Sequence, residues 1–410
     1  MANVTRVDYG KYAGVKRVDT RRKREPLLSK GKIYAIIALI IFVFIGFRMA
    51  TMEANLELTT TFTVPKGVSL SGVGADVTGV KWAAAIDGQV IVGNDEKKVQ
   101  PTASTTKMIL SLMIMEKKPF KLGEKGETIE ITEEMYDKYG WYLTHDGSNS
   151  QVKIGEKISE YDALVSTMLV SSNNMADSLA IWAFGSIDEY QKYTNKTLKD
   201  WGFENTTIGT KDASGYDEGT TSTASDLARI GYRVMLNPVL AEIVGLETAE
   251  VPVAGELTNT NKLLGKAGIV GVKTGYIGDP SGYCIVSAYK AGNHIYTVSL
   301  LGSNTRSDSF DENLAIVKDL QKQLVEIDMI NRGDEVGYYD SWWTNKVTLK
   351  ASESFSEVNF DGAENDAKII EDELIVKIGE SEYGVSLEVP EFSRKPSLIQ
   401  RFLHVFGWKK

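Results

Sequence analysis

The stretch Ala103-Ser104-Thr105-Thr106-Lys107 places a serine three residues before a lysine, at the start of a long apolar segment. A serine hydroxyl attacks a carbonyl carbon only when a base lies within hydrogen-bond reach, and residues three apart share one face of a helix. Residues 108–115 are apolar almost all the way round, which is typical of a helix buried inside a domain. Ser104 would begin that helix, where backbone N–H groups favour a developing oxyanion.

A Ser-x-x-Lys pattern is weak by itself, because a chain of this length contains on the order of two by chance. A second example, Ser29-Lys30-Gly31-Lys32, lies in the basic N-terminal segment. The simpler interpretation of such a pattern is a capping serine beside a solvated lysine. The Ser104 pattern therefore needs support from other parts of the chain.

Two further polar clusters provide that support. Ser171-Ser172-Asn173 interrupts an apolar helical region, where buried polar side chains are costly unless they have partners. Lys273-Thr274-Gly275 lies on an apolar strand, and Gly275 would let a ligand approach the backbone closely. Separately, the first cluster could be a helix cap and the second an edge-strand charge. Together with Ser104 they suggest one site.

Charge and composition exclude several classes of function. The chain has 410 residues and a net charge of −9. Residues 1–32 carry ten Lys and Arg against three acids, a net of +7, so the rest carries −16. Such an acidic body argues against nucleic-acid binding. The lone Cys284 permits no internal disulfide, and the three histidines lack metal-ligand spacing, so we expect neither a metal nor another cofactor.

The N-terminal part of the chain has the pattern of a membrane anchor. Residues 33–47 are apolar and uncharged, between Lys32 and Arg48. We predict a transmembrane signal anchor over 33–50, with a cleavable signal peptide as the alternative, although small residues at cleavage-site spacing fit poorly. The positive-inside rule makes residues 1–32 a basic cytoplasmic tail and leaves the chain after residue 50 outside the cell membrane.

The rest of the chain predicts an α+β domain between smaller segments. After a spacer over 51–77, the domain over 78–330 has a hairpin with its turn at Asp87-Gly88, a helical region over 155–183, three strands near 270–275, 283–288 and 294–300, and a helix ending near residue 328. Residues 333–390 predict a small all-β domain. Residues 393–410 predict an amphipathic C-terminal helix, either at the membrane interface or docked on the β domain.

With these motifs in order, the chain resembles the penicillin-recognising serine peptidases and β-lactamases, whose signature is S-x-x-K, S-x-N and K-T-G. It looks most like the low-molecular-mass penicillin-binding proteins, the serine-type D-alanyl-D-alanine carboxypeptidases. The likeness covers about residues 78–330 and includes the following stretches: residues 100–107, 155–159, 221–228, 259–264 and 271–276.

The resemblance implies a β-lactamase/DD-peptidase-like domain and a role for each motif residue. Ser104 would be the acylated nucleophile, Lys107 its general base, and Ser171 the proton relay to the leaving group. Asn173 would hold the substrate amide, while Lys273, Thr274 and Gly275 would bind the terminal carboxylate. The oxyanion hole would consist of the backbone N–H groups of Ser104 and Tyr276. An alternative register, Ser172 with Asn174, also fits S-x-N.

The implied activity is removal of the terminal D-alanine from peptidoglycan stem pentapeptides, which limits cross-linking, and covalent acylation by penicillins. A DD-endopeptidase or a slow β-lactamase is the alternative, and no Glu-x-x-Leu-Asn segment of a fast β-lactamase occurs between Ser171 and Lys273. An alternative of another class is an inactive, membrane-tethered wall-binding protein. Loss of Ser104, Lys107 or Lys273 would be its signature, and all three are present.

Overall fold

The computed structural model describes residues 30–52 and 55–407, so the predicted cytoplasmic tail lies almost wholly outside the described residues. The chain forms two compact units. One comprises Thr60–Gly337 and Lys350–Glu388, and the other contains the remaining described residues. The two are described separately below.

The larger unit is organised around a five-stranded antiparallel sheet in the order β10-β11-β12-β2-β3. Its strands are β2 (Lys81–Ile86), β3 (Gln89–Asn94), β10 (Ile269–Gly275), β11 (Tyr283–Ala291) and β12 (His294–Ser303). The β2–β3 turn has positive φ at Asp87 and Gly88, as the sequence predicts for a two-residue hairpin. Because β2 pairs with β12, the sheet joins the two ends of the domain.

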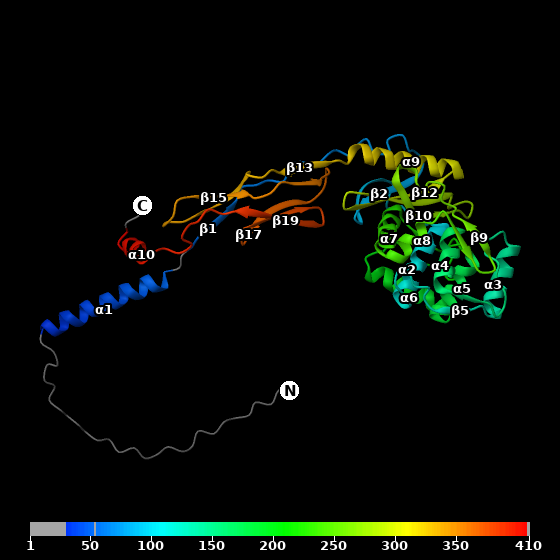
Figure 1. Cartoon of the computed structure of the whole chain (residues 1–410), viewed down its shortest axis with the longest axis horizontal. Coiled ribbons are helices and arrows are strands. Elements are labelled where there is room, and N and C mark those ends of the chain that lie inside the picture. Colours follow the sequence, from blue (N-terminus) through cyan, green and yellow to red (C-terminus); the bar gives the residue numbers. More distant parts are fainter. Residues whose placement is uncertain (1–29, 53–54, 408–410) are drawn as a thin grey trace, which may run out of the picture. The chain divides into compact units, whose positions relative to one another are not determined.

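Alternate side chains of the sheet enter two separate cores. On β2, Trp82, Ala84 and Ile86 face one core, while Ala83 and Ala85 face the other. Helix α9 (Arg306–Gln323) covers the first face with its buried Ile316, Val317 and Leu320. Figure 1 shows α9 on one side of this sheet and, on the other, α7 (Ala224–Leu236), α8 (Pro238–Gly245) and α2 (Lys107–Lys117). The predicted antiparallel sheet packed by helices is therefore confirmed.

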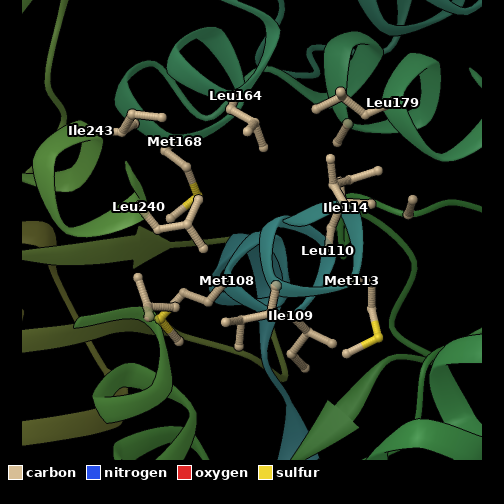
Figure 2. Packing of buried hydrophobic residues seen from close by; sticks show 14 of the residues in the cluster. Met108, Ile109, Leu110, Met113, Ile114, Leu164, Met168, Leu179, Leu240 and Ile243 are labelled. Carbon is tan, nitrogen blue, oxygen red and sulfur yellow. The ribbon is translucent and has the colours of Figure 1, made fainter. Parts of the chain in front are cut away.

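The remaining helices of the domain form a layer around α2 (Lys107–Lys117). They are η1 (Ala103–Thr106), α3 (Glu133–Thr144), α4 (Glu160–Leu169), α5 (Asn173–Phe184), α6 (Ile187–Asp200), α7 (Ala224–Leu236), α8 (Pro238–Gly245) and η2 (Lys266–Gly268). In Figure 2, Leu164 of α4, Leu179 of α5 and Leu240 of α8 surround α2. A helix enclosed on every side needs apolar residues all round, as residues 108–115 provide.

Three pairs of short strands tie the loops of this layer together. They are β4 (Gln100–Pro101) with β7 (Thr221–Ser222), β5 (Thr128–Glu130) with β6 (Lys157–Ser159), and β8 (Thr248–Val251) with β9 (Gly255–Thr258). The β4–β7 pair lies immediately before η1, so it fixes the chain at the entrance to the Ser104 segment.

Two expectations about the edges of the domain differ from the structure. Helix α9 ends at Gln323 rather than near residue 328, and β13 (Glu326–Ile330) follows it and pairs with β16 (Phe355–Val358). The predicted spacer over 51–77 contains β1 (Glu57–Thr60) and three buried core residues, Leu70, Val73 and Val77. These apolar residues are isolated in sequence, so no periodic pattern revealed that they pack beneath the sheet.

Residues 333–390 contain more strands than the sequence suggested. They are β14 (Glu335–Asp340), β15 (Val347–Ala351), β16 (Phe355–Val358), β17 (Asn365–Ile370), β18 (Glu373–Ile378) and β19 (Ser381–Glu388). β17, β18 and β19 form an antiparallel meander. On β18, Leu374, Val376 and Ile378 alternate into the interior, which gives the strand its period of two.

The smaller unit contains helix α1 (Lys30–Thr51) and helix α10 (Leu398–Val405). Helix α1 is the one described helix that is long and apolar enough to cross a membrane. Helix α10 begins with a capping box between Ser397 and Gln400. The Arg401 guanidinium donates a hydrogen bond of 2.6 Å to the carbonyl oxygen of Met49, in the last turn of α1, where carbonyls lack helical partners.

A partly buried ion cluster links the five-stranded sheet to β16 within the larger unit. The imidazole of His294 lies 2.6 Å from Asp87 through Nδ1 and 2.6 Å from Glu357 through Nε2. Hydrogen bonds to Asp87 and Glu357 raise the pKa of His294 to about 10, against the cost of burial. The histidine is therefore a cation held between two carboxylates.

Replacement of His294 by glutamine is expected to lower the melting temperature, because losing one partner of a buried ion cluster costs about 3 kcal/mol. The folded pKa lies above the ordinary value of 6.5, so the stabilisation is complete below pH 6.5 and is lost as the pH rises toward 10. Thermal unfolding followed by circular dichroism at both ends of this range measures the effect. An equal loss at both would show that packing, not charge, is responsible.

The matched control is His145→Gln. His145 is exposed, and its Nδ1 lies near the Trp141 carbonyl and the Thr144 hydroxyl instead of a carboxylate. This variant should lower the melting temperature much less than His294→Gln does.

Candidate active site

Ser104 lies on a 3-10 turn, η1, that leads directly into the buried helix α2. The neighbouring threonines are buried, and each hydroxyl finds a partner within the turn. Thr105 donates to the Thr102 carbonyl at 2.7 Å, and Thr106 donates to the Ala103 carbonyl at 2.8 Å. These bonds tie each threonine side chain to a carbonyl oxygen three residues earlier in the chain. They fix the backbone that carries the nucleophile.

Two glycines allow other segments to approach this turn closely. A Cβ at Gly275 would lie 2.9 Å from the backbone nitrogen of Ser104, and a Cβ at Gly215 would overlap the Ala103 carbonyl oxygen. Gly215 also has a φ of +77°, which favours glycine. The sequence suggested that Gly275 admits a ligand to the backbone. In the structure, the Ser104 backbone is the group that approaches it.

The Lys107 amine is completely buried and lies among three oxygen atoms. Its Nζ is 2.7 Å from Ser104 Oγ, 2.7 Å from Asn173 Oδ1 and 3.0 Å from the carbonyl oxygen of Ser214. Oxygen atoms of three residues thus meet at one nitrogen, and the most distant of them, Ser214, lies 107 positions from Lys107 in the chain. The structure brings together Ser104, Lys107 and Asn173, and it adds Ser214.

Burial determines the protonation of Lys107. Desolvation lowers the pKa of its amine to about 7, while the carboxylates of Asp212 and Asp177 act to raise it. The pKa of Lys273 is lowered well below its usual range, first by burial and then by the nearby charge of Lys107. At neutral pH, a substantial fraction of Lys107 therefore carries a neutral amine.

The S-x-N segment contains two serines with different surroundings. Ser172 is the N-cap of α5: its hydroxyl accepts from the Met175 N–H and donates to Asn174 Oδ1 at 2.7 Å. Ser171 is 7% exposed, and its hydroxyl has no hydrogen-bond partner among the described residues. Its φ of +63° is unusual for a serine. The backbone is thus strained at the serine whose hydroxyl is unoccupied.

Asn174 is a structural residue by its contacts. Its side-chain oxygen accepts from the Ser150 N–H at 3.0 Å, and its amide donates to the Ser150 carbonyl at 3.0 Å. It therefore fastens the loop around residue 150 to the start of α5. Asn173, by contrast, directs its oxygen to Lys107.

The K-T-G segment forms the end of β10. Lys273 is 1% exposed, and its amine donates to the Thr274 carbonyl at 2.9 Å. The Thr274 hydroxyl is 2.8 Å from the hydroxyl of Thr260, which also donates to the Leu169 carbonyl at 3.2 Å. Thr260 therefore connects β10 to the end of α4, next to the S-x-N segment. Tyr276 is half exposed, and its ring stacks on Tyr283 at 4.0 Å.

A group of buried acids behind Lys107 was not predicted. Asp212 accepts from the Ser214 N–H and from the Ser214 hydroxyl, both at 2.7 Å, and so shapes the loop that offers the Ser214 carbonyl. Asp177 accepts from the Ala213 N–H at 2.9 Å and pairs with Lys138 at 3.3 Å. Burial raises its pKa to about 6, although Lys138 opposes the shift. The one sequence signal that could have indicated Asp177 is the presence of an acidic residue inside the apolar helix α5.

These acids do not form a metal site. Over residues 30–52 and 55–407, no three His, Cys, Asp or Glu side chains gather closely enough to hold an ion.

Comparison with known proteins gives consistent relatives. A family model described as D-alanyl-D-alanine carboxypeptidase, peptidase S11, matches residues 83–305. The D-alanyl-D-alanine carboxypeptidase DacF of Bacillus subtilis is 28% identical over 227 residues, which are 53% of this chain and 55% of the relative. The D-alanyl-D-alanine carboxypeptidase DacB2 of Mycobacterium tuberculosis is 26% identical over 256 residues, 61% of this chain and 80% of the relative. This chain thus matches about half of DacF.

A solved structure supports the fold. The D-alanyl-D-alanine carboxypeptidase DacD of Francisella tularensis superposes with a TM-score of 0.57 at 16% identity, over 79% of this chain and 95% of that one. At this identity the likeness concerns the fold alone. The family model, however, covers more than half of the 410 residues. The protein therefore belongs to the D-alanyl-D-alanine carboxypeptidase family of serine peptidases.

Proposed function

We propose that this protein is a D-Ala-D-Ala carboxypeptidase that removes the terminal D-alanine from peptidoglycan stem peptides through an acyl-enzyme on Ser104. The observation that carries the proposal is the buried Lys107 amine within 2.7 Å of the Ser104 hydroxyl. Family membership supplies the substrate class. Penicillins also carry a reactive acyl group, and we expect them to acylate the same serine.

The partners of Lys107 explain how a lysine could serve as the base. A neutral amine has two N–H groups and one lone pair. Asn173 Oδ1 and the Ser214 carbonyl can only accept, so they take both hydrogens. The lone pair is then directed at the Ser104 hydroxyl, and with a pKa of about 7 it can remove that proton near neutral pH. Ser214 thus acts on the reaction through the orientation of Lys107.

The proton then needs a path to the leaving amine. Ser171 stands two residues before Asn173, and its buried hydroxyl has no partner among the described residues, so we assign it the transfer of the proton to the departing D-alanine. Water then attacks the acyl-enzyme carbonyl, which releases the shortened peptide and restores the Ser104 hydroxyl. This assignment selects Ser171 with Asn173 over Ser172 with Asn174. The Ser172 hydroxyl is already hydrogen-bonded to Asn174, and the Asn174 amide to the Ser150 carbonyl.

The terminal carboxylate of the substrate would bind at the end of β10. Lys273 provides the cation and Thr274 a hydroxyl, and Gly275 keeps the strand close to Ser104. A carboxylate beside Lys273 favours the charged form of its amine, which burial otherwise disfavours. The backbone N–H groups of Ser104 and Tyr276 would stabilise the oxyanion of the tetrahedral intermediate.

Two other functions deserve comparison with this one. A DD-endopeptidase would use the same residues on a cross-linked peptide, and a slow β-lactamase would release the penicilloyl group. An inactive wall-binding protein would have no reason to keep a lysine amine buried against a serine hydroxyl, since burial of an ionisable group is costly. The geometry at Lys107 therefore favours a catalyst.

We also propose that helix α1 anchors the protein in the cell membrane and that α10 lies at the extracytoplasmic surface of that membrane. Helix α1 has 22 residues, long enough to span the hydrocarbon core. On α10, the side chains of Leu398 and Ile399 are 74% and 72% exposed. His404 of α10 stacks on Trp342, yet this contact leaves the apolar face uncovered. An apolar helical face beside basic residues suits the lipid interface.

Replacement of Ser104 by alanine should abolish both covalent labelling by a fluorescent penicillin and release of D-alanine from a peptide ending in D-Ala-D-Ala. The full-length chain in detergent is assayed beside the variant, because without Oγ no acyl-enzyme can form. Ser111→Ala is the matched control, since that serine is also buried on α2. Labelling without release would indicate an endopeptidase, and no labelling would support the inactive binding protein.

Alanine substitutions at Ser171 and Ser172 should have opposite effects. Ser171→Ala is expected to slow penicillin acylation by about 100-fold or more with little change in melting temperature, because a proton-transfer group is lost. Ser172→Ala removes an N-cap, which costs about 1 kcal/mol of stability, and should leave acylation mostly intact. Stopped-flow labelling and thermal unfolding measure the two effects. An active Ser171→Ala with an inert Ser172→Ala would reverse the assignment.

A chain that lacks α1 and begins at residue 55 should still bind anionic liposomes through α10. Phe402→Asp places a charge on the apolar face and is expected to reduce binding in a co-sedimentation assay by about tenfold. The control, Gln400→Glu, adds the same charge at the capping position and should reduce binding much less. Equal binding by both variants would instead indicate that α10 serves only as a protein contact.

A further inference from the structure

Asp177 lies on α5, four residues after Asn173, and its side chain is completely buried. Residues four apart lie on one face of a helix, so the carboxylate is on the side of α5 that directs the Asn173 oxygen to Lys107. Asp177 does not line the cavity between α3 and residues 211–219, although its partner Lys138 does. An effect of Asp177 on the reaction would therefore pass through the protein, not through contact with a ligand in that cavity.

Both carboxylate oxygens of Asp177 have partners. Oδ1 accepts from the Ala213 N–H at 2.9 Å. Oδ2 accepts from the Tyr142 hydroxyl at 3.1 Å and lies 3.3 Å from the Lys138 amine. A carboxylate is costly to bury unless a cation and hydrogen-bond donors take the place of its water. Tyr142 and Lys138 are four residues apart on α3, so one face of that helix supplies both.

The Ala213 N–H connects this carboxylate to Lys107. The next residue, Ser214, offers its carbonyl oxygen to the Lys107 amine at 3.0 Å. Only the backbone dihedral angles of two residues separate that N–H group from that carbonyl, so a hydrogen bond to the first restricts the position of the second. Asp212 holds the same loop through the Ser214 N–H at 2.7 Å. The loop that presents the acceptor is thus attached twice, and one attachment comes from α5.

We propose that Asp177 is a positioning residue that holds the Ser214 carbonyl against the Lys107 amine. Lys138 and Tyr142 of α3 hold Asp177 in turn. The proposal rests on the proposed function, in which this amine is the general base. It gives α3 a part in the reaction, although α3 carries none of the S-x-x-K, S-x-N and K-T-G motifs and Asp177 touches neither the substrate nor the reacting atoms.

The charge of Asp177 distinguishes it from a residue that only supports the fold. Desolvation lowers the pKa of Lys107 to about 7, and the Asp177 carboxylate acts to raise it. Burial raises the pKa of Asp177 itself to about 6, and the Lys138 charge opposes that shift and favours the ionised carboxylate. The charged and titratable groups that face these two side chains are Lys138 and Tyr142 of α3, Tyr190 of α6, Asp212 of the loop and Lys273 of β10.

Two substitutions at Asp177 separate position from charge. Asp177→Asn keeps an oxygen for the Ala213 N–H and removes the charge, so Lys107 should lose its proton at lower pH. The acid limb of penicillin acylation then moves to lower pH, and at about pH 6 the rate, as a fraction of the plateau, should rise about threefold. Asp177→Val also removes the acceptor and should lower the plateau rate by about tenfold or more, because the Ser214 carbonyl is no longer held.

The rates are measured by stopped-flow labelling of the full-length chain in detergent with a fluorescent penicillin, from about pH 5 to about pH 9. Thermal unfolding of each variant is followed alongside. The protonation of Lys107 is also followed without any reaction. In a chain with isotope-labelled lysine, the Lys107 Cε signal in the NMR spectrum, identified by its absence in Lys107→Met, reports the titration of the amine. Its midpoint should fall in Asp177→Asn.

A double variant shows whether Lys138 acts through Asp177. Lys138→Met should move the acid limb in the same direction by less, because Asp177 without its cation is protonated over more of the pH range. Combined with Asp177→Asn, it should add little, as expected when one residue acts through the other. Lys211→Met is the matched control, since this lysine also lines the cavity and pairs with an acid, Asp217, at 2.8 Å. The control should leave the pH profile unchanged.

The outcomes separate this proposal from the proposed function. An unchanged midpoint in Asp177→Asn, by labelling and by NMR, overturns the positioning role, as does an effect of Lys211→Met equal to that of Lys138→Met. Release of D-alanine by a native chain whose Asp177 variants behave like it would leave the carboxypeptidase standing. A native chain that releases no D-alanine overturns the carboxypeptidase, whereas a lower NMR midpoint in Asp177→Asn would still support the role of Asp177.

Discussion

The burial of one amine governs the architecture of this protein. Lys107 has no access to solvent, so its charge is penalised, and its nitrogen must find partners inside the fold. Ser104 comes from the same turn, but Asn173 and Ser214 arrive from segments 66 and 107 residues away. The fold must place these three oxygen partners within hydrogen-bond distance of the amine, because a misplaced acceptor would leave a buried donor unsatisfied.

The layers of the domain meet this requirement in different ways. The sheet brings β10 against η1, and the helices α4 and α5 break at residues 170–172, where the S-x-N segment turns toward α2. Asp177 and Asp212 shape the loop that carries the Ser214 carbonyl. The carboxylates have a second effect, since they act to raise the pKa of Lys107 against desolvation. Position and protonation of the amine are thus controlled by the same groups.

Sequence reasoning succeeded where the physical signal is local. The Asp87-Gly88 turn and the alternating strands on both sides predicted the hairpin, and the unbroken apolar run predicted that α2 is enclosed. The three motifs were also local patterns, and hydrogen bonds join Ser104, Lys107 and Asn173 from two of them in the fold. Signals that depend on tertiary packing were missed. Nothing local to Leu70 or Val73 indicates a core residue.

The candidate site shows the same limit at the level of single atoms. Ser214 acts through its backbone carbonyl, which every residue possesses, so no residue type could mark it. The two S-x-N registers are equivalent as letters and differ only in which serine caps α5. The ion cluster of His294 joins three segments, and a lone histidine in the sequence gives no indication of two distant carboxylates.

The glycines against η1 have a consequence for the energetics of the reaction. Gly275 and Gly215 allow their backbones to contact the backbone of the Ser104 turn. The nucleophile is therefore positioned by backbone atoms, which do not change rotamer as side chains do. The entropy of arranging the Ser104 segment is therefore spent when the protein folds, before any substrate arrives. Binding energy of the peptide is then free to act on the transition state instead of ordering the enzyme.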